Sequence, residues 1–473
     1  MPPHPNLLFI LIDDMGWKDL SISGSEFYET PNIDRIAREG MRFTDAYASC
    51  PVCSPTRASV MTGKYPAKVG ITDWIDWGGK AHPRKGRLVD VPYLKGLPDS
   101  ETTLAQVLKE QGYSTWHVGK WHLGGEGSYP QDRGFDVNVG GCERGSPAGS
   151  DGNGYFYPWS IPVLKDLDLP EDTYLTDYLT DQVVNLIEKQ EEGTPFFLNL
   201  WYYTVHTPIQ AKEEKIRKYE QKRLDLGLDK VEELREGELM PYELDHERHV
   251  IRRLVQSDPV YAAMIESLDE NIGRILQTLE DKGVLDNTLI VFTSDNGGLS
   301  TAEGSPTCNT PLAEGKGWMY EGGTREPLFV RWPETITPGS TCETPVTTPD
   351  FFPTLLEAAG GNPADHSDID GVSLIPLFKG ESALPRDAIF WHYPHYGNQG
   401  GTPGASVRMG DYKLIWFFED NHVELYNLRE DIGETTNLAA TEPIRTETMI
   451  AALQSWQHSI EARIPQPNPD WER

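Results

Sequence analysis

The sequence contains little cysteine and little positive charge. Its 473 residues include five cysteines, which are Cys50, Cys53, Cys142, Cys308 and Cys342. So few scattered thiols exclude a disulfide framework, and the odd number leaves at least one thiol unpaired within the chain. Lysine and arginine total 42 against 73 acidic residues, which gives a formal net charge of −31. A surface of this sign repels nucleic acid and anionic membranes, so we expect neither as a partner.

Long hydrophobic runs are also missing. No apolar run reaches the roughly 18 residues that a membrane-spanning helix needs. The first apolar run, "NLLFILIDD", is preceded by no lysine or arginine and ends in two aspartates instead of a small-residue cleavage site. We therefore interpret it as a buried strand and expect a cytoplasmic protein. A periplasmic or secreted protein is the alternative if a leader was removed before this sequence begins.

The most regular feature of the sequence is an alternation of helical and strand patterns. Amphipathic stretches such as "YAAMIESLDENIGRILQTLEDKG" precede short apolar runs such as "NTLIVFTSDNGG". This alternation predicts an α/β fold with a large, mostly parallel sheet covered by helices on both faces. Ligands of such sheets bind beyond the carboxyl ends of the strands. The polar residues that end the apolar runs should therefore converge at one edge, namely Asp13, Asp14, Lys120, His122, His206, Asp295 and Asn296.

The chain is longer than the roughly 250–300 residues at which a single core stops growing. We predict a catalytic domain over residues 1–383 and a C-terminal subdomain over residues 384–473. Within the C-terminal subdomain, the pattern of residues 406–431 predicts two or three antiparallel strands, and the pattern of residues 447–463 predicts a closing helix. The charge-dense segment 212–253 is interpreted as a solvated helical insertion.

Cys50 and Cys53 have the spacing of a zinc half-site or a redox pair, and a lone cysteine is most often an inert buried thiol. No second C-x-x-C or H-x₃-H accompanies them, and the surrounding pattern is not that of a small βαβ unit. The residues after Cys53 argue against an inert role. The segment "CSPTRASVMTGK", which begins at Cys53, fits C-x-P-x-R followed by Gly-Lys.

This segment resembles the signature of the sulfatase family, in which the cysteine is oxidised after synthesis to formylglycine. Further motifs follow in the family's order over most of the first 325 residues: "DD" from Asp13, "GKWHLG" from Gly119, "HTP" from His206, "SDNGG" from Ser294 and "KGWMYEGG" from Lys316. The likeness is greatest to the group that contains arylsulfatase A and N-acetylgalactosamine-6-sulfatase. It implies an alkaline-phosphatase-like fold.

The resemblance implies a sulfuric ester hydrolase in which the hydrated formylglycine at position 53 attacks sulfur. A formylglycine-generating enzyme would be the maturation partner, and Arg57 would hold the hydrate. Lys120 and Lys316 would bind the sulfate. His122 would act as the base that releases sulfate from the intermediate, and His206 would protonate the leaving alcohol, a role shared with Lys316.

The expected metal site contains oxygen donors, from Asp13, Asp14, Asp295 and Asn296. Carboxylate and amide oxygens suit Ca²⁺ or Mg²⁺ and not zinc. The resemblance implies Ca²⁺, and Mg²⁺ is the alternative.

Aromatic and histidine side chains suggest a sugar pocket. Trp74, Trp77, His392 and His395 are candidates for it, since aromatic faces stack on sugars. Packing between the two domains is the alternative for the two histidines. Glu143 and Arg144 are further candidates in a neighbouring loop.

The resemblance implies a sulfated saccharide substrate, a galactose or N-acetylgalactosamine sulfate at a chain end of a glycosaminoglycan or algal polysaccharide. Two alternatives remain open. One is a formylglycine-dependent phosphonate or phosphate ester hydrolase, and the other is a non-catalytic protein that binds sulfated glycans.

Overall fold

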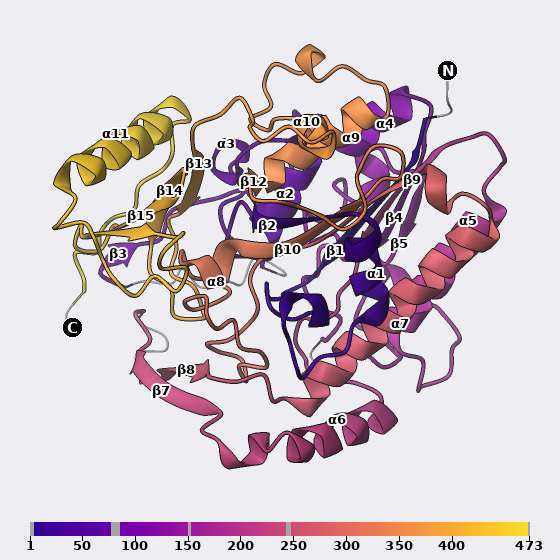
Figure 1. Ribbon diagram of the computed structural model, residues 1–473, viewed down its shortest axis with the longest axis horizontal. Coiled ribbons are helices and arrows are strands. Elements are labelled where there is room, and N and C mark those ends of the chain that lie inside the picture. The colour runs from indigo at the N-terminus through magenta and orange to yellow at the C-terminus, as the bar shows by residue number, and fades with distance from the viewer. Residues whose placement is uncertain (1–3, 77–85, 150–152, 243–246, 472–473) are drawn as a thin grey trace.

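The computed structural model describes residues 4–76, 86–149, 153–242 and 247–471 (Figure 1). Its central sheet has the strand order β11-β2-β10-β9-β1-β6-β4-β5, with β12 beside β2. The strands are β1 Asn6–Ile12, β2 Met41–Tyr47, β4 Ser114–Gly119, β5 Val137–Val139, β6 Phe196–Trp201, β9 Thr288–Ser294, β10 Arg325–Arg331, β11 Ser340–Cys342 and β12 Val346–Thr347. β1 pairs in parallel with β6 and β9, and β10 runs antiparallel to both β9 and β2. The predicted mostly parallel sheet is confirmed.

Both faces of the sheet are buried. Along β1, Leu8 and Ile10 belong to the core formed with α1, α5 and α7, whereas Leu7 and Phe9 belong to the core formed with α2, α4 and α9. These helices are α1 Pro31–Glu39, α2 Cys53–Thr62, α4 Leu104–Glu110, α5 Leu175–Lys189, α7 Pro259–Asp281 and α9 Phe351–Ala358. Figure 1 shows α5 and α7 side by side along one flank. A strand covered on both sides loses the alternation of polar and apolar residues, which explains why "NLLFILI" is continuously apolar.

Short elements connect the larger ones. The short helices and strands are α3 Pro66–Val69, α8 Glu321–Thr324, α10 Ile375–Phe378, β3 Leu88–Val89 and β17 Gln466–Pro467. The 3₁₀ helices are Ser21–Ser23, Pro130–Arg133, Pro162–Leu164, Leu228–Lys230, Leu285–Asn287, Thr348–Asp350 and Pro363–Asp365.

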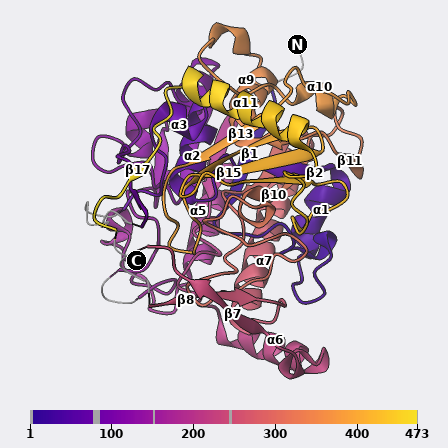
Figure 2. The ribbon, with the colours of Figure 1, turned by 90° about the vertical axis from the view of Figure 1, so that its left-hand side faces the viewer.

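A second, antiparallel sheet lies near the C-terminus, with strands in the order β13-β14-β15-β16. They are β13 Ile389–Tyr393, β14 Gly404–Met409, β15 Tyr412–Phe417 and β16 Val423–Asn427. Helix α11, Pro443–Ser459, contacts β14 and β15 and lies across this sheet in Figure 2. The small antiparallel sheet with a closing helix is confirmed, and the boundary at residues 383 and 384 stays a prediction.

The charge-dense insertion differs from the expectation. Its first part is helix α6, Glu213–Asp225, but its second part is a hairpin of β7, Leu234–Leu239, and β8, His249–Arg253. Figure 2 shows α6, β7 and β8 at the lower end of the molecule. The expectation of a helical insertion was wrong for this second part. Tertiary bonding explains the difference, because the backbone N–H groups of Ile251 and Arg253 donate to Thr301 and Ser300.

Within the described ranges, no helix combines the length and the apolar content that crossing a bilayer requires.

Candidate active site

The expected site residues lie at the carboxyl ends of the central strands. Asp13 and Asp14 follow β1, Lys120 follows β4, and Asp295 and Asn296 follow β9. Helix α2 starts at Cys53 and brings Arg57 to the same edge one turn later. The remaining expected residues come from loops, and all of them join one cluster: His122, His206 and Lys316.

Cys53 is the first residue of α2 and is 3% exposed. Its Sγ lies 3.3 Å from Nδ1 of His122. Burial raises the pKa of the Cys53 thiol although Lys120 and Lys316 oppose this. The unmodified thiol is therefore protonated and a weak nucleophile at neutral pH.

His122 is held so that one ring nitrogen faces Cys53. Its backbone has φ 58°, in the left-handed region that is uncommon for residues other than glycine. Nε2 lies 2.6 Å from the carbonyl oxygen of Ile75, which can only accept, so we assign the ring proton to Nε2. Burial and the nearby charge of Lys120 lower the pKa of His122 well below its usual range. Nδ1 of the neutral ring is thus available to accept a proton from a group at position 53.

Arg57 is fully buried and fixed by two acceptors. Its Nε and Nη2 donate to Oδ2 of Asp295 at 2.9 and 2.7 Å, and Nη1 donates to the carbonyl of Lys120 at 3.0 Å. The guanidinium also lies 5.2 Å from the ring centroid of Trp201. These contacts fix the relative positions of α2 and the ends of β4 and β9.

Two buried lysines pair with the two aspartates that follow β1. Lys120 Nζ donates to Oδ2 of Asp13 at 2.7 Å, and Lys316 Nζ donates to Oδ2 of Asp14 at 2.8 Å. Burial lowers the pKa of the Lys316 ammonium, but the nearby Asp14 carboxylate and Cys53 thiol outweigh this effect and raise the pKa above its usual value. Lys316 is therefore a fixed cation beside Cys53, able to neutralise an anionic ligand.

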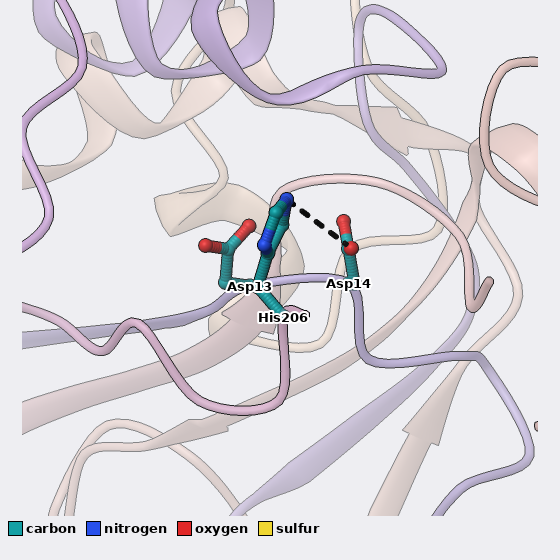
Figure 3. Close-up of side chains that lie close together, drawn as sticks. All are labelled: Asp13, Asp14 and His206. Carbon is teal, nitrogen blue, oxygen red and sulfur yellow. Dashed lines mark ion pairs between the residues drawn. The ribbon is translucent and has the colours of Figure 1, made fainter. Parts of the chain in front are cut away.

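His206 lies between these two aspartates (Figure 3). Its Nδ1 lies 2.8 Å from the carbonyl of Thr207, and its Nε2 lies 3.7 Å from Oδ2 of Asp14. Burial, with Lys316, lowers the pKa of His206 to about 3. The ring is neutral at pH 7 before an anion binds.

The acidic residues fit a hard divalent cation. Oδ1 of Asp13 and Oδ1 of Asn296 are buried and have no hydrogen-bond partner among the described residues. Burial raises the pKa of Asp13 to about 8 even though Lys120 opposes this. A bound cation would satisfy both oxygens and restore the ionised carboxylate. Ligand atoms of Asp13, Asp14 and His206 lie within 4.8 Å of one another, so the structure adds a histidine to the neighbourhood of the expected oxygen donors.

A cavity of about 360 Å³ opens above Cys53. Trp74 and Arg144, expected as sugar contacts, line it together with His122, His206 and Lys316. The backbone at Gly145 passes close to the ring of His122. Only glycine fits there without displacing the ring, because a Cβ at position 145 would lie 2.5 Å from it.

Three other candidate sugar contacts are placed differently, and a fourth lies outside the described residues. Glu143 accepts from Tyr129 Oη at 3.1 Å and is not among the described residues that line the cavity. His392 bonds to the carbonyl of Arg463, and His395 bonds to Thr72 and Asp90, so neither of these buried histidines lines the cavity. The bonds of His395 reach the predicted catalytic domain, as in the packing alternative, whereas His392 bonds within the predicted C-terminal subdomain, to Arg463 and Gln457. Trp77 lies outside the described residues.

The sequence analysis did not identify four polar residues of the cavity lining, Ser146, Glu303, Asn398 and Gln399. No motif marks them, since each lies in an irregular loop without periodicity.

The comparisons with known proteins cover nearly the whole chain. Residues 5–361 match the family described as "Sulfatase", and residues 314–459 match "N-sulphoglucosamine sulphohydrolase, C-terminal". A "Sulfatase" of Formosa agariphila is 33% identical over 95% of this chain and 87% of its own length. The "N-acetylgalactosamine-6-sulfatase" of Homo sapiens is 32% identical over 96% of this chain and 79% of its own length.

Among solved structures, "Ps i-CgsB in complex with k-i-k-neocarrahexaose" has a TM-score of 0.76 and 27% identity, and the match covers 99% of this chain and 94% of that one. The family match spans well over half of the chain and includes the site around Cys53. The chain therefore belongs to the sulfatase family and is a sulfuric ester hydrolase.

Proposed function

We propose that the protein is an exo-acting carbohydrate sulfatase that hydrolyses galactose or N-acetylgalactosamine sulfates, with Cys53 oxidised to formylglycine. The observation that carries the proposal is the position of Cys53 at the base of a cavity of about 360 Å³, beside His122, His206 and Lys316. A cavity near the lower end of the usual range for small-molecule pockets suits a terminal sugar better than the interior of a polysaccharide.

The formylglycine hydrate, once formed, supplies one hydroxyl to attack sulfur and a second to release the sulfate. Lys120 and Lys316 bind the sulfate oxygens and neutralise the charge that shifts onto them. Nδ1 of His122, which faces position 53 at 3.3 Å, accepts the proton of the second hydroxyl.

The leaving alcohol needs a proton, which we assign to His206, shared with Lys316. The pKa of His206 is low because of burial and the charge of Lys316. An anionic sulfate ester beside both groups offsets the charge of Lys316 and favours the protonated imidazole. Lys316, whose pKa is raised, is the second proton source at the same cavity.

Asp13, Asp14, Asp295 and Asn296 would hold Ca²⁺, with Mg²⁺ as the alternative. When bound, the ion would lower the pKa of the attacking hydroxyl. Asp295 also accepts from Arg57 and from the backbone N–H of Asp14, and these bonds hold its carboxylate at the site.

The relatives support a sulfated saccharide as substrate. One relative is named for N-acetylgalactosamine 6-sulfate, and the solved structure with the TM-score of 0.76 holds a neocarrahexaose. The cavity wall formed by Trp74 supplies an aromatic ring of the kind that stacks on sugars.

The test begins with protein produced together with a formylglycine-generating enzyme. We expect the mass of the tryptic peptide 43–57 to show loss of sulfur and gain of an aldehyde oxygen at Cys53. The same preparation should release sulfate from monosulfated galactose or N-acetylgalactosamine. An intact thiol despite a competent maturation enzyme would overturn the proposed nucleophile.

Phosphate diesters and phosphonate esters serve as competing substrates in this assay. Faster turnover of these than of sulfate esters would favour the phosphonate and phosphate hydrolase alternative. Binding of sulfated oligosaccharides by the modified protein without sulfate release would favour the non-catalytic alternative.

A further inference from the structure

The rim of the cavity carries one carboxylate among the described residues that line it, that of Glu303. The other charged side chains of that lining are Arg144 and Lys316, both cations. Lys316 lies at the base beside Cys53, where the sulfate would bind, so Glu303 is the anion that a bound sugar meets away from its sulfate group.

Hydrogen bonds from three residues hold this carboxylate. Asn398 Nδ2 and Gln399 Nε2 donate to Oε1 of Glu303 at 2.6 and 3.0 Å. Thr207 Oγ1 donates to Oε2 at 3.4 Å, which is a long contact. Oε1 is therefore engaged twice, while Oε2 keeps capacity to accept from a ligand.

The backbone also fixes Glu303. Three successive residues, Glu303, Gly304 and Ser305, have φ of 54°, 91° and 45°, in the left-handed region. For glutamate and serine this conformation is uncommon and persists only when the surroundings impose it. The orientation of the carboxylate is thus set by tertiary contacts.

Those contacts come from strand β8 of the charged insertion. Ile251 N and Arg253 N donate to the carbonyls of Thr301 and Ser300 at 3.1 and 2.9 Å, and Ser305 Oγ donates to the carbonyl of Ile251 at 2.6 Å. Arg253 Nε also donates to the carbonyl of Ser305. The insertion therefore supports the loop that presents Glu303 to the cavity.

A carboxylate in this position discriminates between substrates by charge. It accepts hydrogen bonds from a sugar hydroxyl or an amide N–H, and it repels a second sulfate or a carboxylate.

We infer that Glu303 is a specificity-determining residue, which selects a monosulfated sugar with uncharged hydrogen-bond donors on the part that faces Glu303 and rejects sugars with a second anionic group there. This inference rests on the proposed function and narrows its substrate class to singly charged terminal sugars.

The test compares two substrates that differ by one charge, a monosulfated galactose or N-acetylgalactosamine and the same sugar with a second sulfate. We expect wild-type kcat/KM to be at least about tenfold higher for the monosulfated sugar. In Glu303→Gln this ratio should fall by about fivefold or more, because the amide keeps the shape and removes the repulsion. Glu303→Lys should favour the disulfated sugar.

Glu334→Gln is the matched control. Glu334 is exposed, has φ 71°, and is not among the described residues that line the cavity. This variant removes the same charge from the same kind of backbone conformation and should keep the wild-type ratio. A Glu303→Gln ratio within about twofold of wild type would overturn the inference.

If the Glu303 variants do not fold, salt supplies the test in the wild-type enzyme. Discrimination by charge at this exposed rim should weaken as ionic strength rises to about 0.5 M, and an unchanged ratio would overturn the inference. A preference of the wild type for the disulfated sugar would also overturn the inference, because the charge of Arg144 would then outweigh that of Glu303. Absence of sulfate release from every substrate would instead contradict the proposed function.

Discussion

Cys50 and Cys53 are both buried, but their surroundings differ. Cys50 packs in an apolar cluster that includes Val52 and Trp391, and burial raises the pKa of its thiol well above the usual value. Cys53 instead borders the cavity and faces Nδ1 of His122. The two cysteines are therefore distinguished by what each side chain faces and not by burial.

We predict that Cys53→Ala lowers kcat by more than about 10³-fold while the melting temperature changes little, because the variant removes the proposed nucleophile and only one buried atom. Sulfate release and thermal unfolding monitored by circular dichroism are the measurements. Cys50→Ala is the matched control, three residues away and equally buried, and should stay active. Substantial activity in Cys53→Ala would contradict the assigned role.

We predict that Asp13→Asn abolishes stabilisation by calcium, because Asp13 supplies a buried carboxylate oxygen with no hydrogen-bond partner among the described residues. Calcium at 100 times its dissociation constant should stabilise the wild type by about 2.7 kcal/mol. Isothermal titration calorimetry and unfolding with and without calcium measure the effect. Asp166→Asn, which changes an exposed aspartate, should bind calcium as the wild type does. Equal calcium affinity in Asp13→Asn would remove Asp13 from the metal site.

At the scale of elements, helix α7 shows how local chemistry sets a helix boundary. Pro259 occupies its first turn, and the Asp258 carboxylate accepts from the backbone N–H groups of Val260 at 2.9 Å and Tyr261 at 3.1 Å. These bonds satisfy two of the donors that a helix start leaves without intrahelical partners.

We predict that Asp258→Ala lowers the free energy of unfolding by about 1 kcal/mol, because it removes this cap. Asp258→Asn should be close to wild type, since asparagine caps about as well as aspartate. Denaturant unfolding at equilibrium measures both. If the two variants lose the same stability, the charge of Asp258 and not the cap is responsible.

Hairpin β7–β8 shows the opposite case, in which the local sequence does not decide the element. Residues 234–253 are rich in charge, yet Val250 is fully buried. Backbone hydrogen bonds connect β8 to the carbonyl groups of Thr301 and Ser300. The segment that bonds to β8, Ser300 and Thr301, lies about fifty residues further along the chain. The local sequence pattern therefore does not predict this strand.

At the scale of the whole molecule, a buried ionic cluster joins the two sheets. Lys413 on β15 lies 2.9 Å from Glu321 on α8 and 3.1 Å from Glu434, and all three side chains are fully buried. Burial opposes ionisation of Glu321, but Lys413 and Arg325 hold its pKa below the usual value. Burial, against the opposing effect of Lys413, raises the pKa of Glu434 to about 8. One carboxylate is thus ionised and the other holds a proton at neutral pH.

The raised pKa of Glu434 makes stability depend on pH. The unfolded chain loses this proton near the ordinary glutamate pKa of 4.5, while the folded protein keeps it up to about pH 8. The unfolded state therefore binds fewer protons between these values, and this contribution to stability falls as pH rises through that window.

We predict that Glu434→Gln, which replaces the protonated carboxyl by a neutral group of the same shape, reduces the stability lost between about pH 5 and about pH 8 by up to about 3 kcal/mol. Denaturant unfolding at the two pH values, compared with wild type, measures the difference. An identical pH dependence in the variant would show that Glu434 is ionised in the folded protein.

Much of the fold and the centre of the candidate site could be predicted from the sequence. Continuous apolar runs indicated strands buried on both faces, and the polar residues after them, such as Asp13 and Asp295, marked the edge where the strands end. Residues of the outer cavity could not be predicted in the same way. Glu303 and Asn398 share a hydrogen bond although they lie 95 residues apart, and both come from loops without periodicity.

The sequence by itself determined the sheet class, the family and the residues grouped around Cys53, because short motifs and apolar periodicity are local properties of the chain. Only the tertiary structure decided that His392 and His395 lie away from the lining of the cavity, that the second part of the insertion forms a hairpin, and that Glu303 lines the cavity. These outcomes depend on which distant segments pair and how loops cross the sheet edge. The free energy of such contacts is set by the assembled surroundings, which local patterns do not encode.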